Sequence, residues 1–317
     1  MTSSPADDPT RRFSDRATDY AQSRPGYPDT LRDALLRGLE SPVRAADVGA
    51  GTGIGARWLA DADAARGVEV VAVEPNAAMR AAAAPHRRVA WQDGSAERTG
   101  LDDQSVDVVL CAQAFHWFAT PVAVAEFARV LRPGGRLALL WNRRDDRDPC
   151  TAAYGQELRQ LAGEAPAEAF RFDPQLLAAC PAFAPVDTVR VPGEQCLDRA
   201  GLLGRALSAS YVPKDGPVHD ELLRRLDALH ARFADGAGTV TLRYTAELHL
   251  ATRRADALCL SDQRPAPRAP AARRRHSART RCRAGTRPGS PRCRGTAAAP
   301  TPAARRRTRT APPSSAA

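Results

Sequence analysis

Residues 47–53 read Asp47-Val48-Gly49-Ala50-Gly51-Thr52-Gly53, and this stretch decides the fold. The apolar residues before it, from Ala45, indicate a short strand. The residues after it indicate a helix, because Ile54, Trp58 and Leu59 fall on one helical face. Glycines at alternate positions let the backbone turn sharply and let a ligand approach it closely. Free amides at the start of the helix point toward the turn, which favours an anionic or carboxylate group there.

A carboxylate occupies the matching position of the next strand. The unbroken apolar run Val70–Val73 is typical of a strand buried on both faces, and it ends at Glu74, 25 residues after Gly49. A carboxylate there can accept two hydrogen bonds from ribose hydroxyls, which predicts a nucleoside-containing cofactor. The segment Gly51–Ala56 also fits the G-x-G-x-x-A form of a dinucleotide fingerprint, so these residues alone leave the choice of cofactor open. A tight turn without a ligand is the remaining interpretation.

The chain up to about Leu250 alternates short apolar runs with helical periodicity, which is typical of βαβ units. Strands are predicted over residues 45–49, 70–73, 88–91, 106–111, 136–141, 186–191 and 239–250, and helices over 31–39, 54–59, 76–84, 121–131, 152–161 and 222–233. The predicted fold class is α/β: a Rossmann-like, doubly wound, seven-stranded sheet, mostly parallel, with a helical insertion before the last strand.

Several motifs follow one another in a recognisable order. They are Asp47–Gly53, Glu74-Pro75-Asn76 with Met79, Asp93–Glu97, Asp107 with the run Ala112–Phe118 (Ala-Gln-Ala-Phe-His-Trp-Phe), and Leu131–Gly135. The set resembles the class I S-adenosylmethionine-dependent methyltransferases. The subgroup it resembles is the small-molecule type 11 group, which includes quinone-biosynthesis and trans-aconitate methyltransferase relatives. The N-terminal Phe13–Arg16 and Tyr20–Pro28 add to the resemblance, which is strong over residues 12–142, diffuse over 143–254 and absent beyond.

The resemblance implies how S-adenosylmethionine would be bound. The glycine turn would hold its methionine end, with Asp47 near the ammonium group. Glu74 would hold the ribose hydroxyls, Met79 would pack on the adenine, and Asp93 would accept from the adenine amino group. A loop acid that caps a turn is the alternative interpretation of Asp93. The other implied contacts are Gly49, Gly51 and Gly53 in the turn, Ser95 and Ala96 through their backbones, and Gln113 near the sulfur.

The run after the fourth strand is expected to face the methyl acceptor. Methyl transfer from a sulfonium is an in-line displacement, so its main requirement is to hold three atoms collinear. His116 is a candidate base, because the usual histidine pKa of about 6.5 suits proton removal. A histidine packed between aromatic rings without moving a proton is the alternative, and Arg24 can pair with a carboxylate of the cofactor or of an acidic substrate. The other expected acceptor-site and lid residues are Tyr20, Tyr27, Phe115, Trp117 and Phe118.

The net charge of +10 is unevenly distributed. Residues 255–317 contain 15 arginines and two acids, whereas residues 1–254 carry a net charge of −3. The last segment contains no Phe, Trp or Tyr, so it cannot bury enough apolar surface to offset its ordering entropy. We predict a methyltransferase domain over 1–254, with an N-terminal lid (10–40), a cofactor core (41–142) and a substrate-side part (143–254). Residues 255–317 are predicted to be a disordered Arg/Ala/Pro-rich tail or the product of a shifted reading frame.

Composition narrows the classes of function. No apolar run approaches the roughly 18 residues of a membrane span, residues 1–10 lack the apolar segment of a signal peptide, and the seven cysteines show no zinc-site spacing. We therefore expect a cytoplasmic enzyme without a metal that methylates a small molecule and releases S-adenosylhomocysteine. An RNA methyltransferase or nucleic-acid binding protein that uses the basic tail is the alternative, although the tail lacks aromatic residues for base stacking. An NAD(P)-dependent oxidoreductase would leave Asp93–Glu97 and Ala112–Phe118 unexplained. No motif indicates the acceptor or the oligomeric state.

Overall fold

The computed structural model describes residues 23–163 and 169–255, and the account that follows is confined to these two ranges. The predictions for Tyr20, for the first part of the N-terminal lid and for the basic tail lie outside the described residues.

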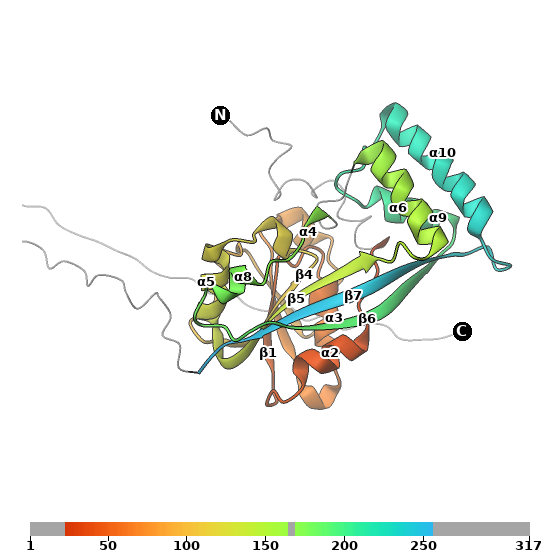
Figure 1. Cartoon of the computed structure of the whole chain (residues 1–317). Helices are drawn as coiled ribbons and strands as arrows, with labels where there is room; N and C mark the ends of the chain where they lie inside the picture. Colours follow the sequence, from red (N-terminus) through yellow and green to blue (C-terminus); the bar gives the residue numbers. More distant parts are fainter. Residues whose placement is uncertain (1–22, 164–168, 256–317) are drawn as a thin grey trace, which may run out of the picture. The chain divides into compact units, whose positions relative to one another are not determined.

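One sheet of seven strands forms the centre of the fold, in the order β3-β2-β1-β4-β5-β7-β6 (Figure 1). Neighbouring strands from β3 to β5 pair in parallel, and β7 is antiparallel to both of its neighbours. The order reverses between β1 and β4, and ligands of such sheets bind at this switch point. The predicted α/β fold with a mostly parallel seven-stranded sheet is confirmed. The strands are β1 (Arg44–Val48), β2 (Glu69–Val73), β3 (Val89–Gln92), β4 (Val106–Ala112), β5 (Leu131–Arg144), β6 (Asp187–Leu197) and β7 (Val240–Thr252).

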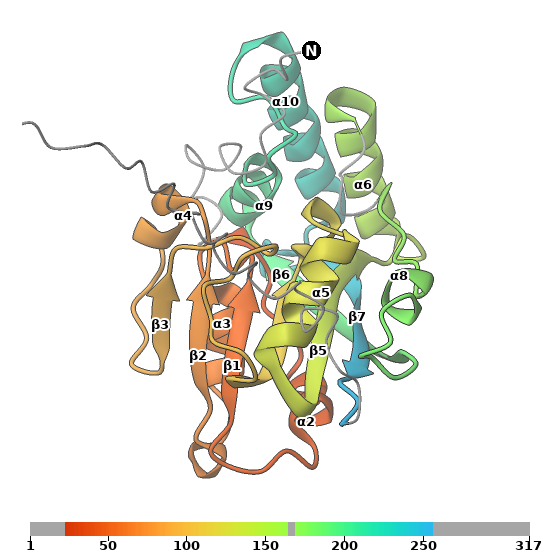
Figure 2. The same cartoon turned by 90° about the vertical axis from the view of Figure 1, so that its left-hand side faces the viewer.

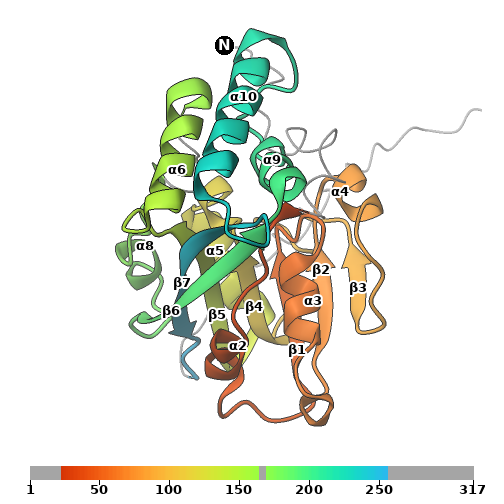
Figure 3. The ribbon, with the colours of Figure 1, turned by 90° about the vertical axis from the view of Figure 1, so that its right-hand side faces the viewer.

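Different helices cover the two faces of the sheet. On one face, α5 packs with α8 (Figure 2), and on the other α2 packs beside α3 (Figure 3). Side chains of β5 alternate between the two cores: Leu139 and Trp141 belong to the first, Leu140 to the second. This alternation explains why β5 reads as a continuous apolar run. The helices are α2 (Asp29–Leu36), α3 (Ile54–Ala60), α4 (Ala77–Ala81), α5 (Pro121–Val130), α6 (Pro149–Ala162), α8 (Gln175–Ala178), α9 (Arg199–Leu207) and α10 (Gly216–Phe233), with short 3-10 turns η2 (Ala64–Arg66) and η3 (Phe115–Trp117).

A helical cap made of α6, α9 and α10 has its own core beyond the carboxyl ends of the parallel strands (Figure 2). The α10 stripe of Leu222, Leu226 and Leu229 is buried in this core, as expected for a packing stripe. Helices α9 and α10 stand between β6 and β7, which is the predicted helical insertion. Helices α8 and α9 were not predicted from the sequence. Within the two described ranges, no helix has both the length and the apolar character needed to cross a membrane.

The segment Pro133-Gly134-Gly135 differs from its prediction as a turn that precedes the fifth strand. Strand β5 already begins at Leu131, which pairs with Val106, and the next pair joins Arg136 to Val108. The glycines therefore lie in a bulge within the strand. Gly134 adopts a φ of +80° and donates its amide to the carbonyl of Arg253, so the bulge is tied to the end of β7.

Candidate cofactor and acceptor site

A cavity of about 220 Å³ lies at the ends of β1, β2, β3 and β4, where the strand order reverses. Its wall is built from the turns after these strands, from the segment that precedes α2, and from α9. Residues far apart in the sequence therefore meet at the edge where α/β sheets bind ligands. The predicted site residues that line the cavity are Arg24, Tyr27, Gly49, Gly51, Glu74, Met79, Ser95, Ala96, Gln113, Trp117 and Phe118.

The β1–α3 turn has a backbone that favours glycine. Gly49, Gly51 and Gly53 adopt φ values of +71°, +58° and +77°. A Cβ atom on Gly49 would lie 2.9 Å from both Ala114 Cβ and Phe118 Cε1. No side chain fits at Gly49, so its main chain contributes to the wall together with Ala50 and Gly51. Gly53 does not line the cavity: it precedes α3, and a Cβ there would lie 2.8 Å from the Trp91 ring.

Glu74 joins two turns of the site. Its Oε2 accepts from the Gly51 amide at 2.8 Å and its Oε1 accepts from the Asn76 amide at 2.9 Å. Glu74 is 8 % exposed, and burial raises its pKa, although both amides and Arg80 oppose the shift. Each oxygen keeps lone-pair capacity for a further donor, such as a ligand hydroxyl. Glu74 therefore both shapes the glycine turn and presents an acceptor to the cavity, and the sequence indicated only the second role.

Asp47 lies behind the turn and does not line the cavity. It is 1 % exposed, and neither carboxylate oxygen has a hydrogen-bond partner of normal geometry among the described residues. Burial raises the pKa of Asp47 to about 7; the Ala56 amide and Arg57 oppose this shift, and Glu74 adds to it. A Cβ on Gly55, which does line the cavity, would lie 2.9 Å from Asp47 Oδ2. The expected contact of Asp47 with a ligand ammonium stays a prediction, and Gly55 is the residue that lines the cavity next to this carboxylate.

Asp93 also departs from its expected position. Its side chain is 74 % exposed and forms an ion pair with Arg80, with 3.0 Å between Nη1 and Oδ1. Arg80 also donates to the Glu74 carbonyl, so it holds Asp93 beside α4, outside the cavity wall. The following residues Ser95, Ala96 and Glu97 line the cavity instead.

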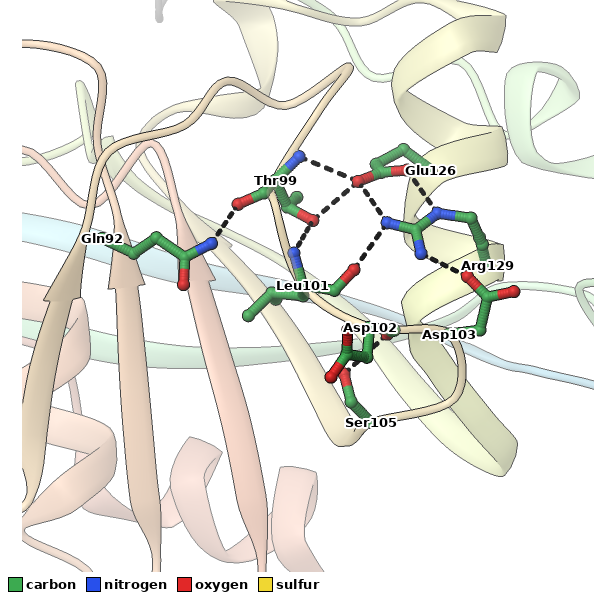
Figure 4. Close-up of polar contacts among 8 residues, drawn as sticks. All are labelled: Gln92, Thr99, Leu101, Asp102, Asp103, Ser105, Glu126 and Arg129. Atoms are coloured by element: carbon green, nitrogen blue, oxygen red, sulfur yellow. Dashed lines mark hydrogen bonds and ion pairs between the residues drawn. The ribbon is translucent and has the colours of Figure 1, made fainter. Parts of the chain in front are cut away.

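The loop after β3 is fixed in place by a polar network with α5 (Figure 4). Glu126 Oε1 accepts from both the amide and the hydroxyl of Thr99, at 2.8 and 2.7 Å. Arg129 then joins Glu126 to the Leu101 carbonyl, donating to each at 2.8 Å. Gln92 at the end of β3 donates to the Thr99 carbonyl at 2.6 Å. These contacts hold the segment that carries Ser95 and Ala96 against the body of the domain.

The aromatic run after β4 is divided between the cavity and the core. Trp117 and Phe118 line the cavity. Phe115 does not: it is fully buried, with its ring centroid 5.9 Å from that of Phe118 and 6.5 Å from that of Trp141. The 3-10 turn η3 turns Phe115 inward, whereas Trp117 at its end and Phe118 directly after it line the cavity. The expected role of Phe115 in an acceptor pocket is therefore replaced by core packing.

His116 packs against rings and is not part of the cavity wall. Its ring centroid lies 4.8 Å from that of Trp117 and 6.1 Å from that of Phe170. Burial, together with the positive charges of Arg143 and Arg24, lowers the pKa of His116 to about 4. The imidazole is neutral at pH 7 but is a weak base, which favours the packing interpretation.

Sequence reasoning missed two charged residues of the cavity wall, Glu97 and, on α9, Arg205. Glu97 ends the Asp93–Glu97 motif, whereas Arg205 lies in no motif. No local pattern distinguishes it from the other 44 arginines of the chain. Only the packing of α9 against the rest of the cap brings it to the site.

The fold and the site together define a class I methyltransferase architecture: parallel strands with an antiparallel β7, a glycine turn after β1 and a carboxylate after β2. Residues 46–139 match a family model described as a methyltransferase domain of the type 11 group, and the chain is similar to that family over this part.

Individual relatives agree with this assignment. The chain is 45 % identical over 146 residues to an uncharacterized methyltransferase of Mycobacterium bovis, which covers 45 % of this chain and 56 % of the relative. It is 35 % identical over 161 residues to an uncharacterized methyltransferase-like protein of Schizosaccharomyces pombe, covering 49 % and 61 %. The chain thus spans little more than half the length of these relatives. A solved structure of a candidate type II methyltransferase from Anaeromyxobacter dehalogenans superposes with a TM-score of 0.52 at 27 % identity, covering 73 % of this chain and 98 % of that chain.

Proposed function

We propose that this chain transfers a methyl group from S-adenosylmethionine to a small organic acceptor and releases S-adenosylhomocysteine. The observation that carries the proposal is the contact between Gly51 and Glu74 at the cavity, which combines a wall of bare main chain with a buried acceptor. The first suits the methionine end of the cofactor, and the second suits the ribose diol. The family match over residues 46–139 supports methyl transfer in general.

The residues present fit this cofactor. The glycine turn leaves no side chain between the main chain and a ligand, and Met79 with Ile54 provides an apolar wall for a purine. When bound, S-adenosylmethionine supplies a methyl carbon whose bond to sulfur breaks, with the electron pair going to sulfur, as the acceptor's lone pair forms the new bond. Glu74 would orient the ribose through its two oxygens. Trp117 and Phe118 would exclude water and hold the acceptor in line.

In this proposal, the rate of methyl transfer depends on holding the acceptor in line with the methyl group, and not on a base that removes a proton. His116 has a pKa of about 4 and is absent from the cavity wall. Asp47 has a pKa near 7 but lies behind Gly55. We infer that the acceptor presents a lone pair that needs no strong base, or gives its proton to solvent.

Side chains of the helical cap and of the N-terminal segment, namely Arg205, Arg24 and Tyr27, line the proposed acceptor side of the cavity. A wall of this kind favours a small molecule over a polymer such as RNA.

Calorimetric titration of the full chain tests the proposal. We expect S-adenosylmethionine and S-adenosylhomocysteine to bind and NADH not to bind. Binding of NADH without either sulfur ligand would overturn the proposal in favour of an oxidoreductase. Mass spectrometry of pooled metabolites incubated with the enzyme and S-adenosylmethionine should then detect products heavier by one methylene.

A further inference from the structure

Arg205 is a buried cation at the cavity wall. It belongs to the buried face of α9, together with Leu202 and Ala206, and is 9 % exposed. Because Arg205 also lines the cavity, the cavity is where its side chain is accessible. The hydroxyl groups of Tyr154, Tyr211 and Tyr244 are the polar groups that act on its guanidinium.

No carboxylate of the described residues forms an ion pair with Arg205, and its Nε has no hydrogen-bond partner there. Burial lowers the pKa of Arg205, but Tyr244 and Tyr154 outweigh this effect, so the pKa is raised and the side chain stays charged. Burial raises the pKa of Tyr154, so this phenol is neutral at pH 7 and cannot balance the charge. A buried charge without a counter-charge is costly to the fold, which calls for an explanation.

Among the described residues, no side-chain group around Arg205 is an acceptor only. In this part of the chain the Tyr154 hydroxyl and the Arg205 Nε are buried without a hydrogen-bond partner, and the Tyr244 hydroxyl interacts with the Arg205 guanidinium. A carboxylate is the complementary group, because it only accepts hydrogen bonds and because its two oxygens match the guanidinium fork.

Charge is segregated along the cavity wall. The acids Glu74 and Glu97 come from the turns after β2 and β3. The arginines stand on the side of the cap: Arg24 also lines the cavity, and its Nη2 donates at 3.3 Å to the carbonyl of Ser208, the residue that ends α9. A ligand with a nucleoside at one end and an anion at the other matches this division.

We propose that Arg205 binds a carboxylate of the methyl acceptor, so that the acceptors of this enzyme are organic acids. The inference rests on the proposed methyl transfer. The carboxylate of the cofactor's methionine end is the other possible source of the anion. We assign the acceptor because the amides of the glycine turn and of the start of α3 serve the methionine end, whereas α9 belongs to the cap.

The test uses the full chain and three variants: Arg205→Met, Arg205→Lys and, as a matched control on the same helix, Arg199→Met. Arg199 is exposed and pairs with Asp227 at 2.7 Å, away from the cavity wall. Methyl transfer from isotope-labelled S-adenosylmethionine is measured on two pools of compounds. One holds hydroxybenzoic and hydroxyphenylacetic acids, whose hydroxyl can accept the methyl group, and the other holds the primary amides of the same acids. Calorimetry gives the affinity for S-adenosylhomocysteine, and thermal unfolding gives the Tm.

The expected result is transfer to the acid pool only, reduced at least tenfold in Arg205→Met and partly retained in Arg205→Lys, with Arg199→Met unchanged. Affinity for S-adenosylhomocysteine should stay within twofold, and Arg205→Met should raise the Tm by about 2–4 °C because an uncompensated charge is removed. A tenfold loss of S-adenosylhomocysteine affinity in Arg205→Met would assign the guanidinium to the cofactor and overturn the inference. Methyl transfer to the amide pool that stays unchanged in Arg205→Met would also overturn the inference. A fall in the Tm of Arg205→Met would overturn it too, because it would indicate a structural role for Arg205. Failure of the proposed function itself is distinguishable, because the wild-type chain would then not bind S-adenosylhomocysteine.

Discussion

The two sides of the cavity are built in different ways. On the cofactor side, main-chain groups and nearby residues make the contacts: the hydrogen bond between Gly51 and Glu74 joins residues only 23 positions apart. On the acceptor side, the contact between Arg24 and Ser208 joins residues 184 positions apart, and Arg205 meets tyrosines from two other elements. The cofactor side is therefore a local property of the strand ends, whereas the acceptor side exists only after the helical cap has packed. Changes on one side should leave the function of the other intact, and the predictions below test this separation.

The largest effect is expected at Gly49 on the cofactor side. Alanine there would have to adopt a φ of +71° and place its Cβ 2.9 Å from Ala114 and Phe118, so the turn must shift. We expect Gly49→Ala to weaken S-adenosylhomocysteine binding at least about 1000-fold, or about 4 kcal/mol, in calorimetric titrations. Gly163→Ala is the matched control, because Gly163 has a φ of +83° with no atom near its Cβ position. If Gly49→Ala and Gly163→Ala lost the same affinity for S-adenosylhomocysteine, backbone strain, and not a contact at the site, would explain the loss.

The next effect concerns the stability of the fold as the pH changes. The pKa of Asp47 is raised from 3.8 to about 7 in the folded state, so the folded protein keeps a proton that the unfolded chain releases between these values. The free energy of unfolding therefore falls as pH rises from about 4 to about 7, by at most about 4 kcal/mol from this residue. Urea unfolding of Asp47→Asn at both pH values should show a smaller fall than the wild type. An identical fall in both proteins would contradict the burial of an isolated carboxylate.

A smaller effect is expected from Glu74→Gln. The amide group offers only one oxygen, so either the Gly51 amide or the Asn76 amide loses its acceptor in a buried position. We expect about 1–3 kcal/mol of lost stability and a loss of S-adenosylhomocysteine affinity of about 30-fold. Glu97→Gln is the control, since Glu97 also lines the cavity but is exposed, and its affinity should change less than threefold. If Glu97→Gln lost more affinity for S-adenosylhomocysteine than Glu74→Gln, the ribose contact would belong to Glu97 and not to Glu74.

The same contrast explains how much the sequence could predict. All seven strands were predictable, because their apolar or alternating runs are local signals. The pairing of Glu74 with the glycine turn follows from the carboxyl ends of parallel strands sharing one edge. The exceptions depend on tertiary contacts. Arg80 holds Asp93 outside the cavity, and η3 turns Phe115 into the core. Arg205 had no signal, because its function depends on what surrounds α9 and not on its own neighbours in sequence.

The smallest effect is expected at His116, which packs against Trp117 and Phe170 outside the cavity wall. The lowered pKa, about 4, means that the ring is neutral throughout the physiological range. Imidazole NMR titration of the intact chain should therefore find this histidine deprotonated down to about pH 5. His116→Phe keeps the ring packing against Trp117 and Phe170, and it should change the rate of methyl transfer less than threefold, with no loss of an inflection near pH 6.5. A hundredfold loss in rate, together with a titration near pH 6.5 that disappears in the variant, would restore His116 as the base. In that case the acceptor would carry a proton that must be removed, and positioning by Trp117 and Phe118 alone would not account for the rate.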